Sequence, residues 1–144
     1  MYKPINYKLS ELAHPKIIND IGEVNTWLRL DDDCMMDLQT IRNEWFKRYG
    51  SGIYVNRLNH GLDSRGLRPP NDSDGSFYST HKQGTTFDLE PVNGKLKELY
   101  NLVIELIKAD KLRAINTLED FECTLKWVHV AKMNTSAKPL IIKL

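Results

Sequence analysis

Apolar residues recur at helical spacing in two stretches of the chain. The first begins at three consecutive aspartates and ends before Gly50, and its apolar residues fall at roughly helical spacing: Met36, Leu38, Ile41, Trp45 and Phe46. The aspartates stand where the amino terminus of a helix favours negative charge. The second covers 95–108, where apolar residues form a stripe opposite charged ones: Leu96, Leu99, Leu102, Val103 and Leu106. The pattern predicts a helix in each stretch, the second lying against one face of a sheet.

An earlier segment, residues 9–20, has the start of a helix but not a clear continuation. Ser10 is a plausible helix cap and is followed by Glu11 and Leu12, whereas Pro15 should interrupt or restart a helix. We therefore expect two short turns or one kinked helix there.

Short β-prone runs predict the strands. One strand is expected at 53–55, near the functional site, and three more in the tail, at 113–118, 124–130 and 140–143. The short spacing of the last three favours antiparallel pairing. The fold class that follows is α+β, with a small antiparallel sheet flanked by helices.

A long polar segment separates the first strand from the rest. Residues 56–77 are rich in Asn, Gly, Ser, Asp and Pro and have almost no periodic apolar pattern. Loops of this length are unusual in a compact domain unless they have a function, so we expect this one on the substrate side of a site.

Composition narrows the class of protein. The 144 residues suit a single domain, 1–144, and the formal net charge of +1 gives no reason to expect nucleic acid or an anionic membrane as a partner. Two isolated cysteines, Cys34 and Cys123, are interpreted as packing residues. The first residues lack the apolar run of a signal peptide, and no window is long enough for a membrane span, so we expect a protein that is cytoplasmic on synthesis, without membrane insertion, and monomeric.

Two histidines and an aspartate form a candidate metal site. His81 and Asp88 are separated by a segment that contains Gly84, which allows the chain to turn, and His129 lies in the predicted strand 124–130. Three such ligands suit Zn²⁺ and leave a fourth tetrahedral position open for chemistry. The alternative is that His81 is a capped loop residue and that His129 belongs to the core.

The order of these residues resembles a known family. Ser79-x-His81-x-x-Gly84-x-x-x-Asp88-Leu89, followed by Trp127-Val128-His129-Val130, is similar to the signature of the M15 family of zinc peptidases. The resemblance implies the hedgehog/DD-peptidase fold and zinc-dependent hydrolysis of an amide bond in peptidoglycan stem peptides, as a D,D-carboxypeptidase, dipeptidase or endopeptidase. Without a signal peptide, such an enzyme would reach the cell wall by release, as phage endolysins do.

The resemblance also suggests residues that would act on the substrate. The stretch Arg65-Gly66-Leu67-Arg68-Pro69-Pro70 resembles an arginine segment found in small members of the family. It implies that Arg68, and after it Arg65, binds a substrate carboxylate, a role that suits a forked guanidinium. Ser79 is the candidate for orienting a metal ligand through a hydrogen bond.

A zinc peptidase further needs a carboxylate that accepts and returns a proton. The candidates are Glu119, Asp120 and Glu122. In many members of the family this acid lies three residues before the last histidine, where this chain has Lys126. The pair Leu118-Glu119 resembles the arrangement in the shorter relatives, so Glu119 is the predicted general base.

Two more positions depart from the family pattern, Thr86 before the aspartate and Ala131 after the last histidine. Neither is a predicted zinc ligand. Together with Lys126 they favour an alternative hypothesis, in which the chain is a catalytically weak or inactive zinc-binding module of a phage or mobile element that binds a cell-wall or protein partner.

Overall fold

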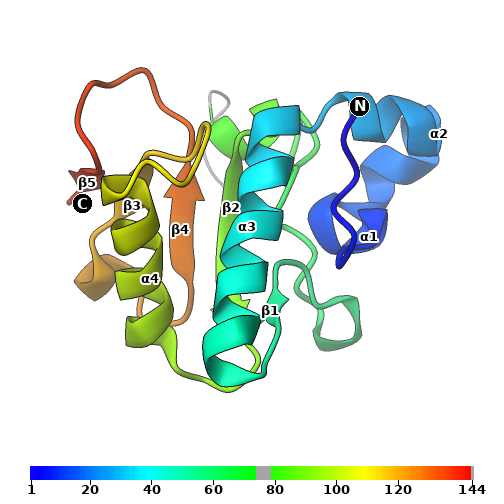
Figure 1. Cartoon of the computed structure of the whole chain (residues 1–144). Coiled ribbons are helices and arrows are strands. Elements are labelled where there is room, and N and C mark those ends of the chain that lie inside the picture. Colours follow the sequence, from blue (N-terminus) through cyan, green and yellow to red (C-terminus); the bar gives the residue numbers. More distant parts are fainter. Residues whose placement is uncertain (74–78, 144) are drawn as a thin grey trace.

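The computed structural model describes residues 1–73 and 79–143, and its fold is α+β (Figure 1). The helices in this part of the chain are α1 (Leu9–Leu12), α2 (Pro15–Leu28), α3 (Asp32–Tyr49) and α4 (Leu96–Lys108). The strands are β1 (Ile53–Tyr54), β2 (Thr86–Pro91), β3 (Thr117–Glu119), β4 (Val128–Ala131) and β5 (Leu140–Ile142). Short 3-10 helices lie at Leu58–His60, Thr80–Gln83 and Phe121–Cys123.

The five strands form one mixed sheet in the order β1-β2-β4-β3-β5. All neighbours are antiparallel except β3 and β5, which run parallel with Leu118 opposite Ile141. The prediction of an antiparallel sheet is therefore wrong for the last strand. The chain reverses after β4, and because β3 already occupies the place beside β4, β5 pairs with the far edge of β3.

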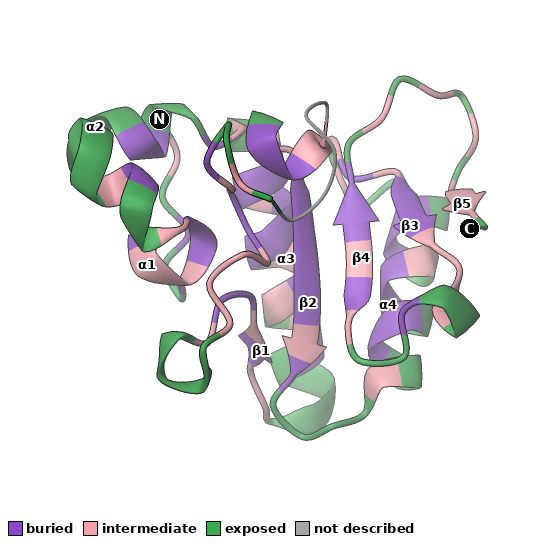
Figure 2. Cartoon of the chain, turned by 180° about the vertical axis from the view of Figure 1, so that it is seen from behind, coloured by how far each residue is buried: buried purple, intermediate pink, exposed green. Residues whose placement is uncertain are grey.

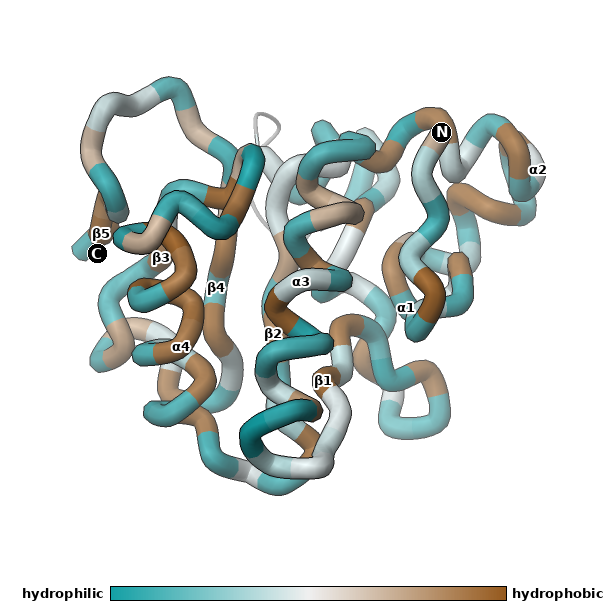
Figure 3. The backbone as a smooth tube through the Cα atoms, viewed as in Figure 1, coloured by the Kyte–Doolittle hydropathy of each residue, from teal (hydrophilic) through white to brown (hydrophobic). Residues whose placement is uncertain are grey.

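Helices α3 and α4 cover one face of the sheet (Figure 1). Alternation along β2 and β4 sends Phe87, Leu89, Val128 and Val130 into the core beneath these helices, and each of them is at most 1% exposed. Figure 3 shows hydrophobic positions recurring along α4 and these strands, while most of the loops are hydrophilic. On the other face of the sheet, turned to the viewer in Figure 2, no α-helix of the described residues packs across β4 and β3. Side chains that alternate with the core residues point to that face.

The predicted helices are present, and the one that begins at Pro15 is longer than predicted. Asp31 caps α3 by accepting a hydrogen bond from the N–H of Cys34, and Gly50 ends this helix in a left-handed conformation. Pro15 restarts a helix, as predicted, with the side chain of His14 as its cap. That helix, α2, continues past residue 20 to Leu28, with non-helical backbone at Gly22 that allows it to bend.

The strands of the tail are shorter than predicted, and one strand was not predicted at all. The segment before β3 does not pair because the buried carboxylate of Asp37 accepts hydrogen bonds from the N–H groups of residues 113, 114 and 115, at 2.7, 2.7 and 2.8 Å. Residues 121–123 form a 3-10 helix, so β4 begins only at Val128. The unpredicted strand is β2, in which apolar Phe87 and Leu89 alternate with polar residues.

None of the helices in the part of the chain that the structure describes is long and apolar enough to cross a bilayer.

Candidate metal centre

Two neighbouring strands bring Asp88 and His129 together. Asp88 lies in β2 directly opposite His129 in β4, and both point away from the helix-covered face because their sequence neighbours are core residues. The Nδ1 atom of His129 lies 2.8 Å from Oδ1 of Asp88. Strand pairing alone therefore unites two predicted ligands that are 41 residues apart in the sequence.

His81 reaches the same place from the 3-10 helix that precedes β2. Its Nε2 atom lies 3.5 Å from Oδ2 of Asp88, and its ring meets that of His129 edge-on, with centroids 5.3 Å apart. Gly84 ends the 3-10 helix with a φ of +73°, and a Cβ there would lie 2.0 Å from the carbonyl oxygen of Arg29. The turn predicted between His81 and Asp88 thus requires glycine for both its conformation and its close approach to the backbone.

A backbone carbonyl fixes the orientation of His81. Its Nδ1 atom lies 3.1 Å from the carbonyl oxygen of Gly66. A carbonyl oxygen can only accept, so Nδ1 carries the hydrogen and Nε2, the atom near Asp88, keeps its lone pair when the ring is neutral. This is the arrangement in which protein histidines bind metal ions.

Gly66 is itself held against the amino-terminal helices. A Cβ at this position would lie 2.0 Å from the carbonyl oxygen of Leu12. The N–H of Leu67 donates to that same oxygen at 2.8 Å, and the N–H of His14 donates to Leu67 at 2.9 Å. The segment that orients His81 is therefore fixed by α1 and by the turn before α2.

Asp88 is ionised in this environment. Burial alone would raise the pKa of its carboxyl, but the hydrogen bond from His129 and the approach of His81 lower it to about 2. The carboxylate must accept in the bond to His129, so the hydrogen between them belongs to Nδ1 of His129.

These three residues fit a metal ion. One ligand atom from each of His81, Asp88 and His129 lies within 4.8 Å of the other two. Two imidazole nitrogens and one carboxylate oxygen are donors that Zn²⁺ accepts, and a set of three leaves a coordination position open. Exposed acidic groups often gather without an ion, but here Asp88 and His81 are both 4% exposed.

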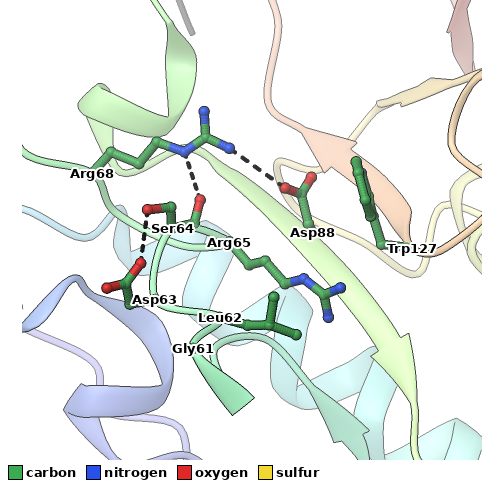
Figure 4. Close-up of a pocket in the computed structure, with 8 residues that line it drawn as sticks. All are labelled: Gly61, Leu62, Asp63, Ser64, Arg65, Arg68, Asp88 and Trp127. Carbon is green, nitrogen blue, oxygen red and sulfur yellow. Dashed lines mark hydrogen bonds and ion pairs between the residues drawn. The ribbon is translucent and has the colours of Figure 1, made fainter. Parts of the chain in front are cut away.

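A cavity of about 200 Å³ opens beside Asp88 (Figure 4). The loop after β1 supplies most of its wall, and Asp88 and Trp127 close it from the sheet: the lining residues are Gly61, Leu62, Asp63, Ser64, Arg65, Arg68, Asp88 and Trp127. The described part of the polar segment 56–77 thus lies beside the cluster. Trp127, which belongs to the motif, lines the cavity.

Both predicted arginines line this cavity, but they are held differently. The Nε–H of Arg68 donates to the carbonyl oxygen of Ser64 at 2.5 Å, and its guanidinium lies 3.7 Å from Oδ2 of Asp88. Arg65 instead forms a short ion pair with Glu90, and its guanidinium lies over the ring of Trp127. Arg68 is therefore the arginine directed at the cluster.

Strand register also places Glu119. In β3, Leu118 lies opposite Val130, so the next residue, Glu119, falls beside His129 on the face that Asp88 shares. Its side chain is half-buried and makes no hydrogen bond or ion pair with another described residue. Asp120 begins the following 3-10 helix and Glu122 is exposed on it, as is Lys126 in the next loop.

Ser79 lies at the start of the 3-10 helix that carries His81. Its carbonyl oxygen accepts a hydrogen bond from the N–H of Lys82. Within the described part of the chain, His81 is oriented by the hydrogen bond that its Nδ1–H donates to the carbonyl oxygen of Gly66. Nothing in the sequence pattern distinguished that glycine or Glu90, because both act through contacts between distant segments.

Comparisons of this chain with known protein families, with curated proteins and with solved structures found no match to any of them.

Proposed function

We propose that this protein is a zinc-dependent peptidase that hydrolyses an amide bond in peptidoglycan stem peptides. The observation that carries the proposal is the convergence of His81, Asp88 and His129 beside a cavity, with Glu119 next in the row across the sheet. The specific substrate class comes from the resemblance of the motif to zinc peptidases of the cell wall.

In this proposal the three residues hold Zn²⁺ through Nε2 of His81, a carboxylate oxygen of Asp88 and Nδ1 of His129. A zinc ion acts as a Lewis acid that polarises a carbonyl oxygen and makes water a better nucleophile near neutral pH. Gly66 keeps the hydrogen of His81 on Nδ1, away from the ion. His129 must release its Nδ1 hydrogen before that atom can bind, so zinc affinity should fall as the pH falls.

Glu119 is assigned the proton transfers. Its carboxylate would accept a proton from the attacking water and deliver it to the nitrogen of the leaving amine, the two steps that amide hydrolysis requires. The position next to His129 on the open face supports this role. A carboxylate without a described partner is also able to accept the proton without first breaking an ion pair.

Arg68 is assigned the substrate carboxylate. Its guanidinium lines the cavity and lies beside Asp88, so a carboxylate bound there would sit close to the scissile amide. The cavity is smaller than the roughly 300–1,000 Å³ of common ligand sites, which suits one or two small residues of a stem peptide.

The test compares the parent protein with His129→Ala, measuring bound zinc and the products of peptidoglycan digestion by mass spectrometry. We expect one zinc and new amino termini from the parent and neither from the variant. His60→Ala is the matched control, because His60 is exposed at the end of a 3-10 helix and is not one of the three proposed ligands. Absence of zinc from the parent protein would contradict the proposal, because every proposed step depends on the ion.

A zinc-binding module with little or no catalysis is the second candidate. The observation that favours it is Lys126, which stands where many relatives of the family have their acid and is exposed in a loop. Stoichiometric zinc without any cleaved muropeptide, together with binding of a cell-wall or protein partner, would establish this function instead.

A further inference from the structure

One carboxylate behind the cavity holds two arginines. Glu90 lies two residues beyond Asp88 in β2, so both point to the same face of the sheet. One of its carboxylate oxygens forms a short ion pair with Arg65, and the other lies 3.3 Å from the guanidinium of Arg57. Glu90 is outside the cavity, whereas Arg65 lines it. Glu90 therefore controls the charge on the wall that Arg65 forms, although Glu90 does not itself line the cavity.

Arg65 is fixed along its whole length. Its N–H donates to the side-chain oxygen of Asn56 at 3.0 Å, and its carbonyl oxygen accepts from the N–H of Asp88 at 2.8 Å. Its guanidinium is 5.6 Å from the ring centroid of Trp127, and its side chain is only 12% exposed. The backbone is anchored at both ends, so the ion pair with Glu90 decides where the guanidinium points.

We propose that Glu90 is a specificity-determining residue, which makes the cavity select a ligand group that carries one carboxylate over a group that carries two. The ligand class rests on the proposed function, but the selectivity is a property of binding and does not require catalysis. Arg68 faces the cluster and binds the first carboxylate. Arg65 would bind a second one, and Glu90 prevents this.

Two physical effects produce the selectivity. The Nη1 donor that Arg65 directs at Glu90 is not offered to a ligand, because a carboxylate already accepts from it. A second ligand carboxylate near Arg65 would also be repelled by the charge of Glu90, in a partly buried place where screening by water is reduced. Held in this way, Arg65 and Trp127 form a flat wall for uncharged groups.

This selectivity has a consequence for stem peptides. A terminal residue with an uncharged side chain brings only its own carboxylate into the cavity. A residue with an acidic side chain, or with a free carboxylate beside an isopeptide linkage, brings two. Peptides of the first kind are the expected ligands.

The test measures binding of two probes, N-acetyl-D-alanine with one carboxylate and N-acetyl-D-glutamate with two. Dissociation constants come from NMR titration of the Trp127 indole signal, with and without one equivalent of zinc. The parent should prefer the alanine derivative. Glu90→Gln should shift the ratio of the two constants toward the glutamate derivative by about tenfold, the effect of one charge-assisted hydrogen bond.

Two further variants make the result decisive. Glu44→Gln removes a carboxylate that pairs with an arginine on α3, away from the cavity, and should leave the ratio unchanged. Arg65→Gln combined with Glu90→Gln should abolish the shift. The proposal is overturned by an unchanged ratio in Glu90→Gln, by an equal shift in Glu44→Gln, or by a shift that persists without Arg65. A failure of peptidase activity alone would leave these binding ratios as they are, so the two proposals fail separately.

Discussion

Asp88 determines the protonation of the whole cluster. Its carboxylate accepts from Nδ1 of His129 and lies near Nε2 of His81, while Gly66 takes the remaining hydrogen of His81. When both rings are neutral, His81 thus presents a lone pair to the cluster and His129 presents a hydrogen. A metal ion would have to replace the hydrogen on Nδ1 of His129, whereas the ligand atoms of His81 and Asp88 are already oriented toward the site.

The lowered pKa of Asp88 predicts a loss of stability in acid. The folded value of about 2 lies below the usual 3.8, so this carboxylate stabilises the fold above pH 4, and the effect disappears as the pH falls toward 2. The shift corresponds to on the order of 2 kcal/mol. Urea unfolding of the metal-free protein should show the free-energy difference between parent and Asp88→Asn shrinking by this amount from pH 5 to pH 2. A difference that is constant over this range would refute the assignment.

Replacement of Glu119 separates metal binding from catalysis. Glu119→Gln keeps the shape of the side chain but cannot accept the proton, so zinc should remain bound while turnover falls about 10²- to 10⁴-fold. Rates of release of new amino termini, with zinc content measured on the same samples, check this. Glu122→Gln changes an exposed carboxylate on the adjoining 3-10 helix and should be fully active. Full activity in Glu119→Gln would remove the residue from the mechanism.

For single residues, the sequence predicted those site residues whose role depends on residue type and on spacing in the chain. His81, Asp88 and His129 were predicted as one group, and the structure brings them together. Gly66 and Glu90 were not predicted, because a carbonyl oxygen is present at every residue and a lone glutamate in a strand has no distinctive pattern.

Strand β2 is the element on which the centre depends. Thr86, Asp88 and Glu90 follow one another on its outer face. Thr86 forms a hydrogen bond with Thr80, Asp88 belongs to the cluster, and Glu90 pairs with two arginines. This strand was not predicted from the sequence, although Phe87 and Leu89 alternate with polar residues as in a strand that buries one face. Helices α3 and α4 were predicted closely, because the apolar stripes of both helices and the caps of α3 are local signals.

The contact between Gly66 and α1 predicts the effect of one added methyl group. In Gly66→Ala the Cβ would overlap the carbonyl oxygen of Leu12, so the backbone must shift and His81 loses its partner. We expect about 1–3 kcal/mol lower stability and about 10- to 100-fold weaker zinc binding. Urea unfolding and zinc titration measure the two effects.

Gly52→Ala is the control for that variant. The nearest atom to a Cβ at this position is Cγ2 of Val92, at an ordinary contact distance of 3.7 Å. Its stability and zinc affinity should stay close to those of the parent. Zinc binding of normal strength in Gly66→Ala would show that the carbonyl of Gly66 does not orient His81.

The whole molecule is assembled around segments that lie far apart in the sequence. The α1–α2 region supports Gly66, the long loop supplies the arginines, and the two central strands supply Asp88 and His129. The pattern of apolar residues predicted the α+β class but not this assembly. The parallel pairing of β5 and the contacts of the loop depend on which positions the other elements leave open, and a local pattern does not contain that information.

Zinc should therefore stabilise the entire fold. A ligand that binds only the folded state adds about 2.7 kcal/mol at a free concentration one hundred times its dissociation constant. For a domain of this size we expect the melting temperature to rise by about 5–10 °C. Calorimetry at increasing zinc concentrations measures the rise, and His129→Ala should show none. An equal rise in that variant would indicate a binding site elsewhere.

The pairing of Asp88 with His129 across β2 and β4 also bears on how the chain reaches its native state. Side chains alternate between the two faces of a sheet, so a slip of one residue between these strands would turn His129 inward and leave Asp88 opposite a valine. Such a misaligned sheet would turn Val128 and Val130 outward, and it could not bind the ion. Zinc present during folding would thus favour the one alignment that has all three ligands on the same side of the sheet.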